Sequence, residues 1–325
     1  MTLYQRLTST RTLFAPKPLP DSRFALGSTV NWMHALALLV DRPGINANSA
    51  RRSYADVSRR EATPCEENTI FAQLLFALHQ CSALDALRKV ECKADVARVG
   101  IVAWYYGIYA AASAMVAAQA GSFQESHTKT ADVWDIQIAK RQLIMPPFNP
   151  RISTLVKTSA DKELRILLSV PKFNLNDSAP KTPDEALGAC HAYLSGSVDY
   201  WRWENEVKVK ESRKFRDLGV LNFQTKAART LRDKRLSQHS IGFLHQAFRY
   251  RGKANYRDTL YLGYGKSVET TLAEYIKDLS KVLDAFVTCA GLFCSRRLGS
   301  ELWDEFIEDV EEKRSFSASP NALWG

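Results

Sequence analysis

The sequence lacks any CxxC pair, and its six cysteines and six histidines are scattered along the chain. Zinc sites need Cys and His ligands at short, repeated spacings, so this pattern gives no support for a metal site. We therefore read the cysteines as reduced, mostly buried thiols of a cytoplasmic protein, and we expect no bound metal.

Several hydrolase motifs are missing as well. There is no G-x-S-x-G, no H-E-x-x-H and no pair of acids in a distinctive setting. These motifs place a nucleophile, or a metal with its general base, so their absence removes the common serine hydrolase and zinc protease classes. Nothing in the sequence supports an organic cofactor, and we expect none.

Charge is absent from Val99 to Gln124, a stretch long enough to cross a bilayer. Ala, Gly, Ser, Gln and three Tyr dilute its apolar side chains, so the gain from transfer into lipid is small. We expect a helix buried on all sides in a protein core and no membrane association. Residues 1–11 also lack the apolar segment of a signal peptide, which favours a cytoplasmic location.

The net charge of +9 is unevenly spread. From Arg141 to Arg257 there are 22 Lys and Arg against 11 Asp and Glu, whereas Glu301 to Glu312 holds seven acids and no base. A basic segment of this kind suits contact with a polyanion, because each neutralised phosphate releases counterions. The alternatives are a solvated helical face or a docking site for the chain's own acidic tail.

The hydrophobic pattern predicts a mainly α protein whose content of 46% hydrophobic residues can bury a sizeable core. Apolar residues recur at helical spacing from Thr69 to Leu87. A second helix is expected from Ala94 to Ala120, ending at Gly121. Further helices are expected after the N-cap signature at Thr182, over Gln224 to Leu236, and from Val268 to Phe293.

Prolines break the pattern between Pro146 and Pro183, where Leu164 to Val170 is the best strand candidate. The predicted fold is thus a helical bundle interrupted by a basic, mostly helical insertion with at most a small β element. The expected divisions are an N-terminal arm (1–64), the first half of the bundle (65–145), the insertion (146–240), the second half of the bundle (241–299) and an acidic tail (300–325).

Two segments carry a family resemblance. The sequence AWYYGIYAAASAM at 103–115, followed by Gly121 and His127, resembles the "YYAMFHAA…ALL…G…TH" signature of HEPN-domain proteins. The sequence RYRGKANYRD at 249–258 resembles the "R..ADY" element that opens their final helix. The length and the YYG helix are also similar to YaaC-like proteins. The resemblance implies a HEPN-like helical bundle, commonly dimeric, of a type that often acts as a metal-independent RNase in toxin–antitoxin and phage-defence systems.

HEPN RNases use an Arg that is followed after a few residues by a His. The Arg is a cation that stabilises the charged transition state, and the His imidazole moves the proton of the 2′-hydroxyl. The equivalent cation here is Arg249 or Arg251, but Asn255 and Tyr256 stand where the His is expected. Asn is not a base, and Tyr titrates far above neutrality. Arg232 and His239, with six residues between them, have the required spacing at an earlier position.

The resemblance and the charge pattern together predict a HEPN-like component of a bacterial defence or toxin system that binds or cleaves RNA, in preference to DNA, as a homo-oligomer. The candidate catalytic residues are Arg249, Arg251 and His239, with His127 as a further proton carrier or a packing group. A catalytically silent subunit, and a protein-interaction subunit whose basic face meets an acidic partner, remain alternatives.

Trp201 and Trp203 could stack bases, although burial of at least one is favoured. The candidate nucleic-acid contacts are Arg202, Lys208, Lys210, Arg213, Lys214, Arg229, Arg232, Lys234, Arg235 and Lys253.

Overall fold

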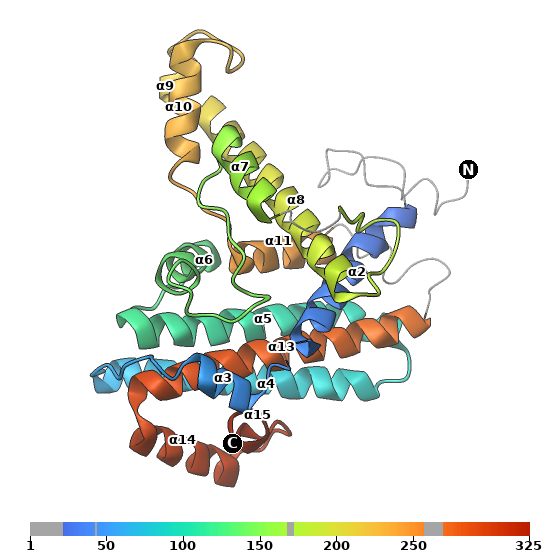
Figure 1. Cartoon of the computed structure of the whole chain (residues 1–325), viewed down its shortest axis with the longest axis vertical. Coiled ribbons are helices and arrows are strands. Elements are labelled where there is room, and N and C mark those ends of the chain that lie inside the picture. Colours follow the sequence, from blue (N-terminus) through green and yellow to red (C-terminus); the bar gives the residue numbers. More distant parts are fainter. Residues whose placement is uncertain (1–21, 43, 168–171, 257–268) are drawn as a thin grey trace.

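The computed structural model describes residues 22–42, 44–167, 172–256 and 269–325. The predicted mainly α fold is confirmed (Figure 1). Three long helices lie along one another at the centre, where α5 packs against both α4 and α13. These are α4 (Pro64–Lys89), α5 (Lys93–Ala120) and α13 (Glu269–Leu298).

Local signals fix the ends of these helices. Thr63 and Glu66 form a reciprocal capping box at the start of α4, with Pro64 in its first turn. Gly121 ends α5 in the left-handed conformation (φ 62°), as predicted. The start predicted for α13, at Val268, lies outside the described residues.

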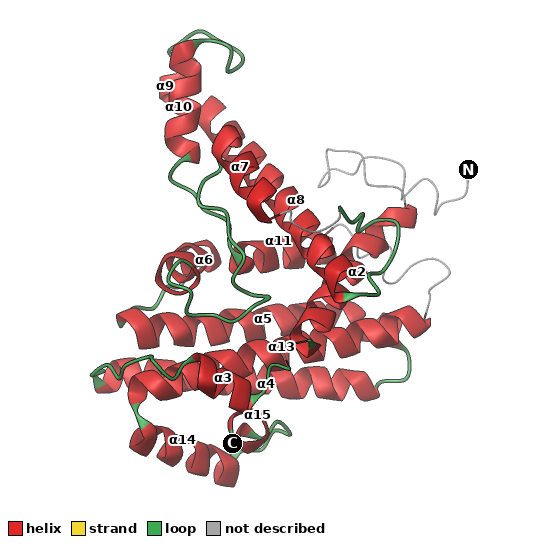
Figure 2. Ribbon diagram, in the orientation of Figure 1, coloured by secondary structure: helices red, strands yellow, loops and turns green. Residues whose placement is uncertain are grey.

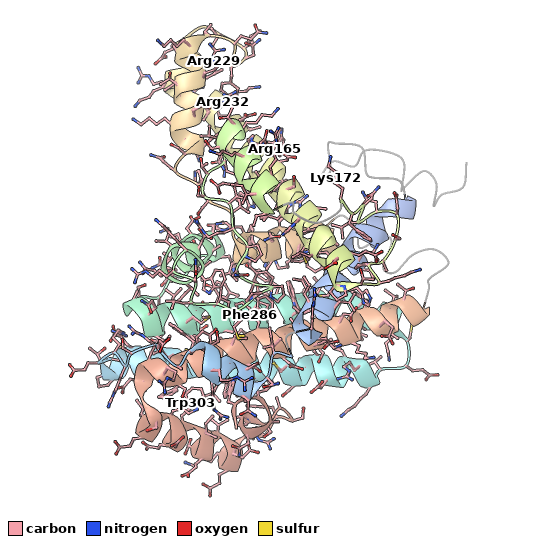
Figure 3. The ribbon with its side chains drawn as sticks, in the orientation of Figure 1. Arg165, Lys172, Arg229, Arg232, Phe286 and Trp303 are labelled. Atoms are coloured by element: carbon pink, nitrogen blue, oxygen red, sulfur yellow. The ribbon has the colours of Figure 1, made fainter. Side chains whose placement is uncertain are left out.

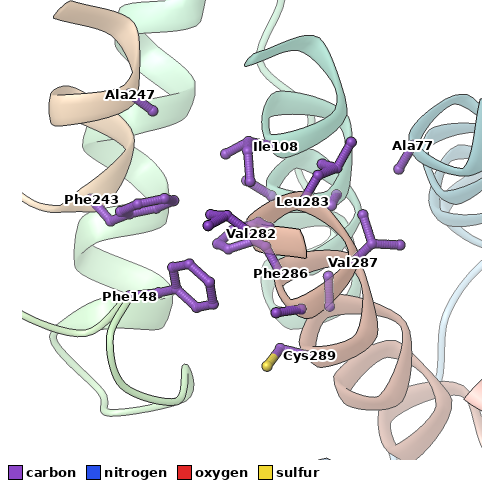
Figure 4. Packing of buried hydrophobic residues seen from close by; sticks show 14 of the residues in the cluster. Ala77, Ile108, Phe148, Phe243, Ala247, Val282, Leu283, Phe286, Val287 and Cys289 are labelled. Atoms are coloured by element: carbon purple, nitrogen blue, oxygen red, sulfur yellow. The ribbon is translucent and has the colours of Figure 1, made fainter. Parts of the chain in front are cut away.

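Aromatic side chains fill the centre of the bundle. Phe243 on α11 (Phe243–Tyr256) and Phe148 on a loop both contact Phe286 of α13, with ring centroids 5.5 Å and 5.0 Å away (Figure 4). Ile108 of α5 lies close by on the same core. Because these residues come from separate parts of the chain, burial of their rings ties the two halves of the bundle together.

The region expected as an N-terminal arm contributes a core helix instead. The helix α2 (Ser22–Asp41) buries Trp32 and Met33, and the Trp32 ring stacks on Tyr193 at 4.1 Å. The short helix α3 (Ala47–Ser53) follows it and packs on α13.

The expected insertion is helical but is not separate from the bundle. Its longest helix, α8 (Pro183–Lys210), starts at a capping box on Thr182, as predicted. Cys190 and Tyr193 in its first half belong to the main core, whereas its second half extends away from the bundle (Figure 1). Two short helices, α9 (Arg213–Arg216) and α10 (Lys226–Leu236), pack back along it. We call residues 200–240 the basic arm; they hold 11 Lys and Arg against 5 Asp and Glu.

The prediction of a strand at Leu164–Val170 is wrong for the residues that the structure describes. Leu164 lies in α7 (Lys157–Leu167), where it and Ala160, one helical turn earlier, are buried against α8. Residues 168–170 lie outside the described part. The described residues form no β-strand, and their only β-type pairing is an isolated antiparallel bridge between Ile152 and Ile241 (Figure 2).

The acidic tail forms α14 (Ser300–Lys313), which buries Trp303, Phe306 and Val310, and α15 (Pro320–Trp324) beside it. Labelled residues Trp303 and Arg229 mark opposite ends of the molecule (Figure 3). The acidic tail therefore does not dock on the basic arm of its own chain.

By length and composition, α4 and α5 could each cross a membrane. In this fold 78% of the apolar window of α5 is buried inside the protein, against 39% for α4. Core helices of soluble proteins meet the same criteria, so these features are weak evidence in either direction.

Candidate nucleic-acid interface

A cavity of about 190 Å³ lies where the basic arm joins the bundle. Its wall is formed by α6 (His127–Trp134), α8, α10 and the start of α11. The polar and aromatic side chains that line it are Thr128, Asp132, Trp201, Asn205, Lys208, Arg235, His239, Ser240 and His245. We call it the His239 pocket.

His239 is the free proton acceptor of this pocket. Its ring has no hydrogen-bond partner in the described part of the chain. Burial lowers the pKa of His239 below its usual value, Asp132 opposes this shift, and the positive charges of Arg235 and Lys208 add to it. The imidazole is therefore neutral near pH 7 and able to take up a proton.

Two cations of the basic arm stand beside it. The Arg235 Nε donates to the Asn205 Oδ1 at 2.8 Å, which holds the guanidinium at the pocket while its terminal nitrogens make no hydrogen bond to the described residues. The Lys208 Nζ lies 3.9 Å from the Glu204 carboxylate at an exposed position. Both cations can approach a phosphate that enters the pocket.

The second histidine of the pocket is fixed in place. His245 is buried, its Nδ1 accepts from the Gly242 N–H at 3.2 Å, and its Nε2 lies 3.0 Å from Asp132 Oδ1. With Nδ1 accepting, the ring proton is on Nε2 and points at Asp132. Both ring nitrogens of His245 are therefore satisfied within the protein.

A π-helical turn, η1 (Asp135–Ala139), follows α6 and holds Ser240, a residue that lines the pocket. The fully buried Asp135 accepts from Arg151 Nη2 and from Ser240 Oγ, both at 2.6 Å. A Cβ at Gly242 would lie 2.4 Å from Asp135 Oδ1, so only glycine permits this approach. These contacts hold the segment between His239 and His245 against α6.

The two arginines of the RYR sequence lie on different sides of α11, and neither lines the His239 pocket. Arg249 lies over the rings of Tyr193 and Tyr200 at 5.2 Å and 5.4 Å and donates to Ser197 Oγ. Arg251 lies over Tyr105 at 4.9 Å, in a cluster that includes His127. The structure brings Arg251 close to His127, but not to His239.

The pair selected by spacing, Arg232 and His239, is not brought together either. Arg232 is bonded to Asp233 at 2.8 Å and lies over the Phe223 ring, away from the pocket. The cation beside His239 is instead Arg235, one helical turn earlier in the chain.

The other predicted nucleic-acid contacts divide into two groups. The Arg202 guanidinium donates hydrogen bonds to the Leu155 carbonyl oxygen and to the Asp199 carboxylate, so this side chain stabilises the structure of the arm. Lys210 and Arg213 are exposed on the arm, the latter 3.9 Å from Asp217. The Lys253 side chain lies outside the described part. The exposed cations of the arm that have no acidic partner among the described residues are Lys210, Lys214, Arg216, Lys226, Arg229 and Lys234.

The two tryptophans differ in exposure, and Trp201 is only partly buried. Trp201 packs between the His239 pocket and the Phe248 ring at 6.2 Å, whereas Trp203 is 44% exposed on the arm. Asp132 and Asn205 could not be identified from the sequence, because nothing in their spacing relates them to His239.

Comparisons of the chain with models of protein families, with curated proteins and with solved structures found no match. The resemblance to HEPN proteins therefore stays a prediction, and function is inferred from the chain's own residues.

Proposed function

We propose that this protein is a HEPN-like component of a bacterial defence or toxin system that binds RNA along its basic arm and cleaves it in the His239 pocket. One observation carries the proposal: a neutral, unbonded imidazole lies beside two arm cations at the root of a strongly basic projection. A cytoplasmic location and a homo-oligomeric state are part of the same proposal.

The chemistry follows from the groups present. His239 accepts the proton of a ribose 2′-hydroxyl, and the oxygen attacks the adjacent phosphorus. Arg235 and Lys208 stabilise the extra negative charge of the pentacoordinate transition state. The bond to the 5′-oxygen then breaks, the leaving oxygen takes a proton from water, and a 2′,3′-cyclic phosphate remains.

The first test is incubation of labelled total RNA with the protein in EDTA. We expect cleavage by the wild type and a loss of roughly 10²–10⁴-fold for His239→Ala, the usual contribution of a general base. RNA affinity should stay nearly unchanged, because the arm is intact. The matched control is His79→Ala, on α4 beside Phe316 and outside the pocket, which should cleave like the wild type.

Intact RNA with the wild-type protein would contradict the catalytic part of the proposal, and salt-sensitive RNA binding would then leave a silent RNA-binding subunit. Equal cleavage by His239→Ala would show that the pocket is not the catalytic site.

A protein-assembly subunit is the second candidate, favoured by apolar side chains exposed on and beside the arm. Leu221 is 92% exposed and Ile166 71% exposed. Stoichiometric capture of one partner that persists at high salt, and is lost in Leu221→Asp, would support this alternative over RNA binding.

A further inference from the structure

A second polar cluster lies beside the His239 pocket and takes no part in the proposed cleavage. The guanidinium of Arg251 lies over the rings of Tyr105, Phe248 and Tyr106, with centroids 4.9, 5.5 and 6.0 Å away. Its Nε is buried and has no hydrogen-bond partner, and no acid of the described chain forms an ion pair with it. Buried polar groups are normally satisfied, so this nitrogen lacks an acceptor that a ligand could supply.

His127 adds a second donor to the cluster. Its Nδ1 lies 3.0 Å from the Tyr105 hydroxyl, and its ring packs 4.3 Å from that of Tyr109. Burial raises the pKa of Tyr105, so this hydroxyl keeps its proton and can donate it to Nδ1. In that tautomer the ring proton of a neutral His127 is on Nε2, which has no acceptor among the described residues.

The charge balance of the cluster favours an anion. Burial and the nearby charge of Arg251 both lower the pKa of His127, so the cluster holds one permanent cation and a neutral imidazole donor. The residues around them are aromatic, and aromatic rings supply no counter-charge. A guanidinium fork with an N–H donor beside it matches the several acceptor oxygens of a phosphate.

The cluster is close to the His239 pocket but separate from it. Phe248 contacts Arg251 and His127 on one side and the Trp201 ring at 6.2 Å on the other, and Trp201 lines the pocket. Thr128, directly after His127, also lines the pocket.

We propose that Arg251 and His127 form a second oxyanion site, for a phosphate group, separated from the His239 pocket by Phe248 and Trp201. The phosphate could belong to an RNA backbone or to a free nucleotide or phosphate ion. Only the RNA source rests on the proposed function, because binding of the free ion does not require that the protein cleaves or binds RNA.

The test is titration of the ¹⁵N-labelled protein with inorganic phosphate while the Arg Nε–H and His ring signals are followed by NMR. We expect saturable shifts of the Arg251 Nε–H and His127 signals. Arg251→Met should weaken this binding by about tenfold to a hundredfold, as expected for a charge-assisted hydrogen bond. The matched control is Arg249→Met, two residues away on α11, where the guanidinium already donates to Ser197; it should bind phosphate like the wild type.

Arg251→Lys, which keeps the charge but loses the planar fork, guards against a folding defect and should bind with intermediate affinity. Absence of saturable shifts at Arg251, or equal phosphate affinity in Arg251→Met, would overturn the site. A change in oligomeric state of Arg251→Met without any change in phosphate affinity would also overturn it and assign the cluster to a protein interface.

RNA binding by the same variants distinguishes the sources. Weaker RNA binding by Arg251→Met, with His239-dependent cleavage still measurable, assigns the site to an RNA backbone phosphate. Phosphate binding at Arg251 with unchanged RNA affinity assigns it to a free phosphate-bearing ligand and leaves the proposed function to be judged at His239 alone.

Discussion

Asp284, on the inner part of α13, is held in an environment that disfavours its charge. Burial raises the pKa of its carboxyl group to about 6, and the neighbouring Asp85 adds to this shift. The nearby Cys81 thiol and Ser280 hydroxyl and the charge of Arg88 act in the opposite direction but do not cancel it. At neutral pH the folded protein therefore carries a poorly solvated carboxylate.

We expect Asp284→Asn to stabilise the protein at neutral pH and to have little effect at low pH. The folded-state pKa lies above the unfolded value of 3.8, so the native state binds more protons between pH 4 and 6 and wild-type stability falls as pH rises through this window. The variant does not lose this stability. Its advantage should grow to on the order of 1–2 kcal/mol above pH 6.

Urea unfolding at pH 4, 5.5 and 7.5 measures the effect, with the exposed Asp304→Asn on α14 as control. A variant advantage that is the same at all three pH values, or a loss of stability at pH 7.5, would contradict the assignment.

At the scale of the element, α5 shows how closely two helices approach. A Cβ at Gly107 would lie 2.6 Å and 2.8 Å from the methyl carbons of Leu283 on α13, and 3.1 Å from Gln80 Cβ on α4. At Gly100, two turns earlier on the same helix, the nearest atom to such a Cβ would be a Leu279 methyl carbon at 3.4 Å. The two glycines therefore differ in how much space surrounds them.

We expect the two alanine substitutions to have opposite effects. Gly100→Ala should stabilise the protein by up to about 1 kcal/mol, because alanine is the better helix former and the added methyl group fits. Gly107→Ala should destabilise it by about 1–2 kcal/mol, because overpacking against the buried Leu283 exceeds the same gain. Thermal or urea unfolding of both variants tests this, and a stabilised Gly107→Ala would show that the α5–α13 contact is looser than described.

At the scale of the whole molecule, charge is separated along the longest dimension. The basic arm forms one end, and the acidic α14 lies near the other (Figures 1 and 3). Such a distribution favours binding of a polyanion at the arm end and its repulsion at the other.

We expect RNA binding to weaken steeply with salt, and the slope to depend on the arm. Replacing Lys214, Arg229 and Lys234 together by alanine should lower the slope of log K against log salt by roughly 2, the value for three lost contacts to single-stranded RNA. Lys89, Arg98 and Lys277, exposed on the bundle, form the matched triple control. Equal slopes for both triple variants would contradict the arm as the RNA-binding surface.

The sequence by itself determined the class of fold and some of the helix ends, such as those at Gly121 and Thr182. Caps such as Thr63, Gly121 and Thr182 act through hydrogen bonds and backbone conformations of a few neighbouring residues, so their signals are local. The prediction of a strand at Leu164–Val170 is wrong for its described residues, which lie in α7. A short apolar run suits either a strand or a half-buried helix, so the sequence alone does not distinguish them.

Only the tertiary structure decided which candidate residues share a site. Arg249 and Arg251 are two positions apart, which on a helix places them on different sides, and the packing of α11 between α5 and α8 decides which neighbours each meets. His239 lies near Arg235 because it follows the end of α10 by three residues, a local relation. Its proximity to Asp132 and Lys208 depends on where α6 and α8 are held by the core, and no spacing along the chain encodes such contacts.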